Sequence, residues 1–176
     1  MPVFLSEDDV RRRGRAIEDH RKRLFLEKYL PQVQPFARVR ELFERIRADG
    51  HRIALASSAQ GGELDTYKRI TGIDGLVDAE TSKDDVSRSK PHPDIFEAAL
   101  DRLRLPPDAV VVIGDSPYDA EAGRRAGLRT IGVLSGGFDP TWLLEAGCLA
   151  LFRDPEDLLT HYNRSPLARD NLARGI

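Results

Sequence analysis

The chain has 176 residues, of which 40% are hydrophobic and 32% are charged, a composition that excludes both an intrinsically disordered chain and a membrane-embedded one. Its 27 lysines and arginines are balanced by 29 acidic residues, for a net charge of −2, so it has no excess of positive charge to bind nucleic acid or anionic lipid. The start of the chain shows no secretory leader and the single cysteine, Cys148, has no disulfide partner. We therefore expect a globular, cytoplasmic protein with no nucleic-acid or membrane partner.

An amphipathic helix is predicted over residues 6–30. Ser6 can cap its start, and Val10, Ile17 and Leu24 recur at heptad spacing. The helix contains an arginine-rich stretch, but its eight basic side chains are offset by six acidic ones. This balance favours a solvated helix face over a nucleic-acid-binding patch.

Helix-like and strand-like segments alternate through the rest of the chain. The predicted helices cover residues 36–50, 61–71, 93–104, 117–126 and 155–162, and the predicted strands cover residues 52–56, 76–77, 109–113, 130–134 and 149–152. This order indicates βαβ crossovers and an α/β fold with a three-layer, Rossmann-like parallel sheet. The strands are apolar throughout, which is typical of strands covered on both faces. Residues 164–176 show no period and are predicted to be a frayed tail.

Polar side chains gather near the ends of the predicted strands. Ser57 and Ser58 follow the first strand, Lys90 precedes the helix over residues 93–104, and Asp115 and Asp119 follow the strand over residues 109–113. In open parallel sheets the ligand crevice lies beyond the carboxyl ends of the strands, so we expect these groups to converge. A hydroxyl, an ammonium group and two carboxylates suit a phosphoryl group held beside Mg²⁺.

Each of these residues also has a purely structural interpretation. Ser57 and Ser58 can cap the helix that follows them, and Lys90 can be an ordinary surface lysine. Asp115 can form a turn or cap before Pro117, while Asp119 can be an acid on the helix surface. The functional interpretation is favoured because all of these groups follow separately predicted strands. Cys148 is interpreted as a small buried hydrophobic residue, and the four histidines show no metal-ligand spacing.

Three segments resemble the motifs of a known family. Residues 54–58 (ALASS), 89–96 (SKPHPDIF) and 114–120 (GDSPYDA) resemble the second, third and fourth motifs of the haloacid dehalogenase-like hydrolase superfamily. The branch they resemble is that of phosphoglycolate phosphatase and β-phosphoglucomutase. The resemblance covers roughly residues 20–163. It implies a Mg²⁺-dependent phosphatase that acts on a small phosphorylated metabolite, either phosphoglycolate or a sugar phosphate.

The resemblance also implies a role for each candidate residue. Ser57, with Ser58 beside it, binds the phosphoryl group that is transferred, and Lys90 stabilises the charge of that group. Asp115 and Asp119 serve the Mg²⁺ site. Catalysis is therefore expected to depend on Ser57, Lys90 and Asp115.

The family's first motif, Asp-x-Asp-x-Thr, has no counterpart, because the sequence contains no Asp-x-Asp. In the family its first aspartate attacks phosphorus and its second acts as general acid and base. Residues 78–81 (DAET) imitate the motif but follow the serine motif, so we interpret them as unrelated to it. The family's central strand is then missing as well. We expect a truncated chain, with weak or no turnover, in which residues 1–30 are the remnant of a helical cap, residues 31–163 the core and residues 164–176 a tail.

Two other interpretations stay open. The chain can be a non-catalytic phosphate-binding or regulatory protein that kept the fold and lost the nucleophile. A response-regulator receiver domain uses similar groups, but in the order acid, hydroxyl, lysine, whereas here Ser57 precedes Lys90 and Asp115. The oligomeric state is not predicted, although an uncovered cleft in the sheet could recruit another copy.

Overall fold

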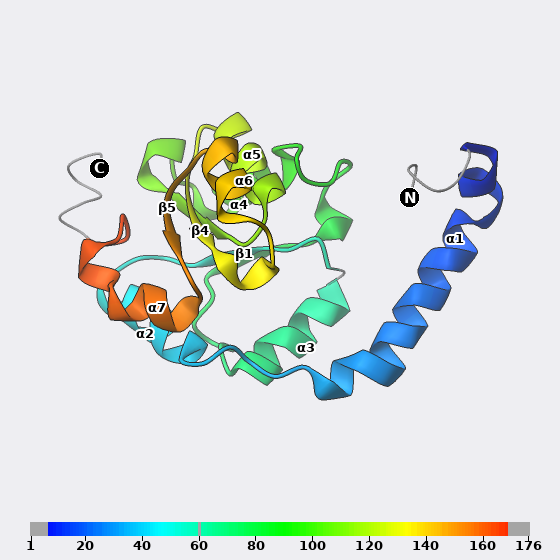
Figure 1. Cartoon of the computed structure of the whole chain (residues 1–176), viewed down its shortest axis with the longest axis horizontal. Coiled ribbons are helices and arrows are strands. Elements are labelled where there is room, and N and C mark those ends of the chain that lie inside the picture. Colours follow the sequence, from blue (N-terminus) through cyan, green and yellow to red (C-terminus); the bar gives the residue numbers. More distant parts are fainter. Residues whose placement is uncertain (1–6, 60, 169–176) are drawn as a thin grey trace. The chain divides into compact units, whose positions relative to one another are not determined.

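The structure is a computed structural model that describes residues 7–59 and 61–168 (Figure 1). The chain divides into two compact units, Met1–Gln34 and Pro35–Ile176. The division falls a few residues after the boundary expected at residue 30. That the first unit is the remnant of a cap stays a prediction.

The first unit is helical. Its described elements are α1 (Glu7–Leu24), a π-helical turn (Phe25–Tyr29) and a 3₁₀ turn (Leu30–Gln32). This confirms the helix predicted over residues 6–30, while the proposed cap, Ser6, lies outside the described residues. Ile17 and Leu24 of the apolar stripe are both exposed.

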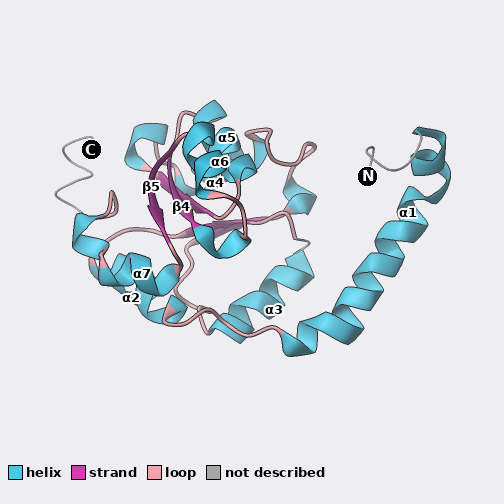
Figure 2. Ribbon diagram, in the orientation of Figure 1, coloured by secondary structure: helices cyan, strands magenta, loops and turns pink. Residues whose placement is uncertain are grey.

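The second unit alternates helices and strands (Figure 2). Its helices are α2 (Val39–Ala48), α3 (Gly61–Thr71), α4 (Asp94–Leu103), α5 (Pro117–Arg125), α6 (Pro140–Ala146) and α7 (Pro155–Thr160). Its strands are β1 (Ala54–Ala56), β2 (Ala79–Thr81), β3 (Val111–Gly114), β4 (Arg129–Val133) and β5 (Cys148–Phe152). The predicted α/β class is therefore confirmed. None of the helices in the described part of the chain has the length and apolar content needed to cross a membrane.

The strands form two parallel sheets rather than one. β1 pairs with β2, and β3, β4 and β5 form a second sheet in that order. Ala54 lies opposite Ala79 in the first sheet, and Val111 lies opposite Arg129 in the second. Among the described residues no ladder joins β1 to β3. That a central strand is missing stays a prediction.

Helices cover the strands with apolar side chains from two sides. One buried cluster joins α2, β4 and α7 and includes Leu42, Ile46, Ile131 and Leu158. A second cluster joins α4, β3 and α5 and includes Ile95, Phe96, Val112 and Ala122. Cover from two sides matches the apolar sequences of β3 and β5.

Two elements differ from the prediction. β2 lies at residues 79–81 rather than 76–77, because Thr81 buries its side chain and donates to the carbonyl oxygens of Leu55 and Ile95, at 3.3 and 3.2 Å. The helix α6 was not predicted. Asp139 caps α6 by accepting a hydrogen bond from the Thr141 N–H at 2.8 Å, and Leu143 within the helix is completely buried.

The prediction of a frayed tail is wrong for residues 164–168. Ser165 and Leu167 are buried, and the His51 Nε2 atom lies 2.9 Å from the carbonyl oxygen of Leu167. Leu167 packs into the same cluster as Ile53, so this segment belongs to the core. Residues 169–176 lie outside the described part of the chain.

Candidate active site

A buried ion pair forms the centre of the candidate site. Lys90 Nζ lies 2.7 Å from Asp119 Oδ1, and the two side chains are only 17% and 9% exposed. Lys90 also donates to the carbonyl oxygen of Ala56 at 3.2 Å and lies 5.4 Å from the centre of the Phe96 ring. The interpretation of Lys90 as an ordinary surface lysine is therefore wrong. Its ammonium group ties the end of β1 to α4 and α5.

The segment that carries Lys90 is fixed on the side of α4. The peptide bond between Lys90 and Pro91 is cis. Arg88, two residues earlier, donates to both carboxylate oxygens of Asp94, at 3.1 and 2.8 Å, and Asp94 is the first residue of α4. A two-bonded arginine–carboxylate pair has a defined geometry, so it ties the backbone near Lys90 to the start of α4.

Asp119 is held by the start of its own helix. Ser116 donates to Asp119 Oδ2 through its hydroxyl group at 2.6 Å and its N–H at 3.1 Å, and its Oγ accepts from the Asp119 N–H. This reciprocal arrangement is a capping box, and Pro117 occupies the first helical position. The Asp119 residue as a whole is buried, so it is not the acid on the helix surface that the structural interpretation describes. Its direct contact with Mg²⁺ stays a prediction.

Asp115 follows β3 and remains in contact with solvent. Partial desolvation, and then the negative charge of Asp119, raise the pKa of Asp115 above its ordinary value. Gly136 packs closely against it, because a Cβ atom at Gly136 would lie 2.9 Å from Asp115 Cγ. The negative charge of Asp119 beside Asp115 would also stabilise a cation bound there.

Ser57 directly follows β1. Its N–H donates to the Thr81 carbonyl oxygen at 3.0 Å, and its Oγ accepts from the Ala59 N–H at 3.1 Å. The second bond matches the capping interpretation, but it uses only the acceptor capacity of the hydroxyl group. The hydroxyl hydrogen can still donate to an anion. Ser58 is exposed beside it.

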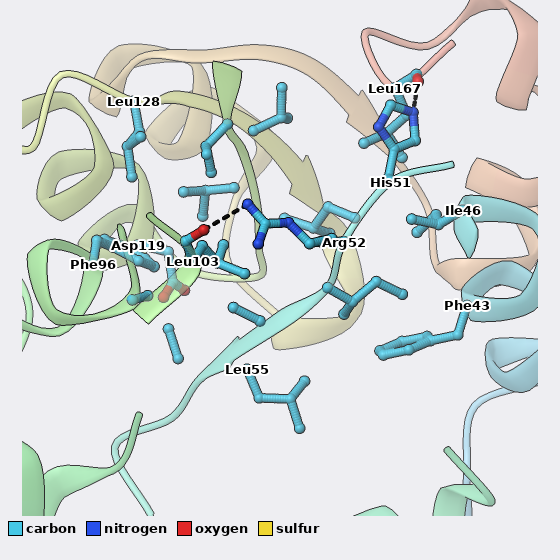
Figure 3. A pocket seen from close by; sticks show the side chains of 18 of the residues that line it. Phe43, Ile46, His51, Arg52, Leu55, Phe96, Leu103, Asp119, Leu128 and Leu167 are labelled. Atoms are coloured by element: carbon cyan, nitrogen blue, oxygen red, sulfur yellow. Dashed lines mark hydrogen bonds between the residues drawn. The ribbon is translucent and has the colours of Figure 1, made fainter. Parts of the chain in front are cut away.

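Most of the predicted site residues share one cavity of about 690 Å³ (Figure 3). Its wall includes Ser57, Ser58, Lys90 and Asp119. Asp115 does not line the cavity but lies beside Asp119 at the end of β3. The structure thus brings together residues that are far apart along the chain.

Asp115 and Asp119 are the acidic groups that the sequence assigns to a metal site. Within residues 7–59 and 61–168 there is no cluster of three or more histidine, cysteine or acidic side chains that could hold a metal ion. Mg²⁺ usually takes only one or two protein carboxylates and keeps several waters. Asp115 is exposed and could supply one such carboxylate, whereas both oxygens of Asp119 already accept hydrogen bonds from Lys90 and Ser116.

Sequence reasoning missed two residues of the site. Ser116 fixes Asp119, and the Ser-x-x-Asp spacing of a capping box was a visible signal for it. Gly136 follows β4 and approaches Asp115 only because of the fold, so no local signal could have identified it.

The known proteins that are similar to this chain include two enzymes and one solved structure with informative names. A phosphorylated carbohydrates phosphatase of Thermotoga maritima is 33% identical over 164 residues, which are 90% of this chain and 74% of that protein. A pyrophosphatase of Bacillus velezensis is 28% identical over 127 residues, 68% of this chain and 59% of its own length. The crystal structure of a putative β-phosphoglucomutase from Thermotoga maritima has a TM-score of 0.72 and 30% identity, covering 86% of this chain and 68% of its own.

The match to a family model extends over most of the chain. The model is described as haloacid dehalogenase-like hydrolase and matches residues 5–133. This range contains the three motifs on which the resemblance was based, including Ser57, Lys90 and Asp115. The chain therefore belongs to the haloacid dehalogenase-like hydrolases.

Proposed function

We propose that this protein is a Mg²⁺-dependent phosphatase of small phosphorylated metabolites, with sugar phosphates, phosphoglycolate and pyrophosphate as candidate substrates. The observation that carries the proposal is the Lys90–Asp119 pair, held at 2.7 Å on the wall of the cavity that Ser57 also lines. The phosphatase and pyrophosphatase relatives support the same class of reaction.

The phosphoryl group would be bound by Ser57 and Lys90. An ammonium group has three protons, and Lys90 uses two of them for Asp119 and Ala56. The third can donate to a phosphoryl oxygen, while the Ser57 hydroxyl group donates to another. Both donors are fixed by bonds to the backbone or to buried side chains, so they need little reorganisation to meet developing negative charge. Ser58 would assist from its exposed position.

Asp115 would hold Mg²⁺, with Asp119 as the second acid. When bound, the ion would supply positive charge that neutralises the phosphoryl oxygens. Asp115 must be ionised to bind it, and its raised pKa means that acidification would weaken metal binding earlier than at an ordinary aspartate.

The Asp-x-Asp motif that carries the attacking carboxylate in the family does not occur in these 176 residues. We propose that residues 1–176 by themselves bind phosphate but turn substrate over weakly, because binding groups alone leave only a residual electrostatic effect. The alternative, a non-catalytic phosphate-binding protein, shares the binding site and differs only in having no turnover.

A phosphate-release assay tests the proposal. The chain is incubated with Mg²⁺ and either phosphoglycolate, glucose 6-phosphate or pyrophosphate, and inorganic phosphate is measured. We expect slow release that Lys90→Met abolishes and the exposed control Lys28→Met does not. A kcat in the ordinary enzyme range, about 1–1000 s⁻¹, would contradict the missing nucleophile. Release that Lys90→Met leaves unchanged would contradict the role of Lys90, and no release at all would favour the non-catalytic alternative.

A further inference from the structure

Three aromatic side chains form a partly exposed group beside the candidate site. Tyr118 and Trp142 are 53% and 58% exposed, and Phe138 is half-buried. The rings of Tyr118 and Phe138 meet edge to face with their centres 6.2 Å apart, and the centres of Phe138 and Trp142 are 6.4 Å apart. We call these three side chains the aromatic ledge. Contiguous exposed apolar groups mark binding sites, whereas exposed apolar residues that stand singly need no explanation.

The core beneath the aromatic ledge holds it in place. Phe138 packs against a buried cluster that includes Leu143 and Cys148. The helices α5 and α6, which carry Tyr118 and Trp142, pack against each other (Figure 1). Because the rings rest on the core and on one another, a ligand would have to order little of the protein in order to bind there.

Two chain segments connect the aromatic ledge to the acidic part of the candidate site. Tyr118 directly precedes Asp119 in α5. Phe138 comes two residues after Gly136, where an added Cβ atom would lie only 2.9 Å from Asp115 Cγ. Asp115 is itself exposed. The ledge therefore adjoins the solvent-exposed carboxylate of the site.

The segments that form the aromatic ledge are unsuited to binding an anion. Residues 114–119 and 134–147 contain no lysine, arginine or histidine. Their charged side chains are all acidic, namely Asp115, Asp119, Asp139 and Glu145. Arg124 lies at the other end of α6, where its Cδ atom would be 3.6 Å from a Cβ atom added at Gly147. The acids would repel a second negative charge on a ligand, whereas the aromatic rings attract other rings and apolar surfaces.

We propose that the aromatic ledge binds an uncharged ring in the leaving group of a phosphate ester, so that ring-bearing esters are the preferred substrates. The inference rests on the proposed function, because Ser57 and Lys90 would hold the phosphoryl group. It narrows the substrate class to phosphate esters of a sugar ring or an aryl ring. It disfavours phosphoglycolate and pyrophosphate, in which the rest of the molecule is anionic. Tyr118 and Trp142 are then specificity-determining residues that take no part in the chemical step.

Ligand binding to the full chain, measured by isothermal titration calorimetry in the presence of Mg²⁺, tests the inference. The ring-bearing ligands are glucose 6-phosphate and phenyl phosphate. Glycerol 3-phosphate is the matched ligand with an uncharged leaving group but no ring, and phosphoglycolate and inorganic phosphate complete the set. Trp142 is the only tryptophan of the chain, so its fluorescence reports on the aromatic ledge independently of turnover.

We expect at least one ring-bearing ester to bind about two- to tenfold more tightly than glycerol 3-phosphate, the range typical of one aromatic contact. Phosphoglycolate should bind no more tightly than glycerol 3-phosphate. The preferred ester should change the fluorescence of Trp142, and its identity shows whether the ring is a sugar or an aryl group. Tyr118→Ala should remove most of the preference, while the control Phe36→Ala, at an exposed aromatic residue outside the ledge, should retain it.

Three results would overturn the inference. The first is that neither ring-bearing ester binds more tightly than glycerol 3-phosphate, which the native chain decides even if Tyr118→Ala does not fold. The second is a preference that folded Tyr118→Ala leaves unchanged. The third is a dimer, detected by light scattering, in which ring-bearing esters do not alter Trp142 fluorescence, because a second copy would then cover the ledge.

The same titrations separate the inference from the proposed function. If inorganic phosphate binds and the preference for a ring is absent, the inference fails and the phosphate site stands. If neither inorganic phosphate nor any of the esters binds, the proposed function fails together with the inference.

Discussion

Replacing Asp119 by asparagine removes the charge that balances Lys90 while keeping the shape of the side chain. The amide oxygen of the introduced asparagine can still accept from the Ser116 N–H, now 3.1 Å from Oδ2, so the helix cap is largely retained. The loss is concentrated on the other oxygen, where an amide N–H or an uncharged oxygen would face the ammonium group of Lys90 in place of a carboxylate at 2.7 Å.

The expected cost follows from the burial of the pair. Removing one partner of a buried ion pair typically costs about 3–5 kcal/mol. Lys90 keeps its bond to the Ala56 carbonyl oxygen and its position over Phe96, and its 17% exposure allows some hydration. We therefore expect Asp119→Asn to lower the free energy of unfolding by about 2–3 kcal/mol, a large share of a typical total of about 5–15 kcal/mol.

The assay is urea unfolding followed by circular dichroism, arranged as a double-mutant cycle with Lys90→Met. The double variant should be more stable than the sum of the single costs predicts, with a coupling of about 2 kcal/mol, because it leaves no unpaired buried charge. Asp139→Asn, at the exposed cap of α6, is the matched control and should change little, since asparagine caps as well as aspartate. An Asp119→Asn cost below about 0.5 kcal/mol, or additive single costs, would refute the reasoning.

Three further changes test other parts of the site and its support. Gly136→Ala should lower the melting temperature and the Mg²⁺ affinity, both measured by calorimetry, because its Cβ atom would clash with Asp115. The control Gly62→Ala, where a Cβ atom would have no neighbour within 4 Å, should be neutral or stabilising by up to about 1 kcal/mol. Equal effects of the two variants would contradict the close approach of Gly136 to Asp115. Because the pKa of Asp115 is raised in the folded protein, its ionisation lowers stability as pH rises from the unfolded-state pKa to the raised one. Asp115→Asn should therefore stabilise the metal-free protein at pH 7 in urea titrations, by a gain that shrinks as pH falls through the raised pKa and is gone below about pH 4. A gain that persists in acid would contradict this. Asp78 has the opposite shift: burial raises its pKa, but hydrogen bonds from Arg47 and from the Ile53 N–H outweigh burial and lower the pKa. Asp78→Asn should therefore lower the free energy of unfolding by about 1 kcal/mol at pH 7, and by less as pH falls through that lowered pKa. A loss of stability that does not depend on pH would refute this assignment.

The local sequence pattern predicted most elements of the second unit. The apolar spacing placed α3 over residues 61–71, as observed, and placed the long strands within about two residues of their observed bounds. It failed at β2, where Glu80 and Thr81 look unlike a buried strand. Thr81 is buried there because the carbonyl oxygens of Leu55 and Ile95 satisfy its hydroxyl group, and only the folded chain supplies those partners.

The candidate site was predicted in its membership but not in its bonding. Strand ends predicted that Ser57, Lys90 and Asp119 converge, and they line one cavity. The pairing of Lys90 with Asp119, and the capture of the second Asp119 oxygen by Ser116, depend on how α5 meets β1 in three dimensions. Spacing alone could not show which carboxylate pairs with the lysine and which stays open to solvent.

Binding of inorganic phosphate in the presence of Mg²⁺, measured by isothermal titration calorimetry, tests most directly whether these side chains form one anion site. The account predicts saturable binding that is lost in Ser57→Ala and in Lys90→Met, and that depends on Mg²⁺ in the native chain but not in Asp115→Asn. Undiminished phosphate binding by the Lys90→Met variant, verified as folded, would contradict it.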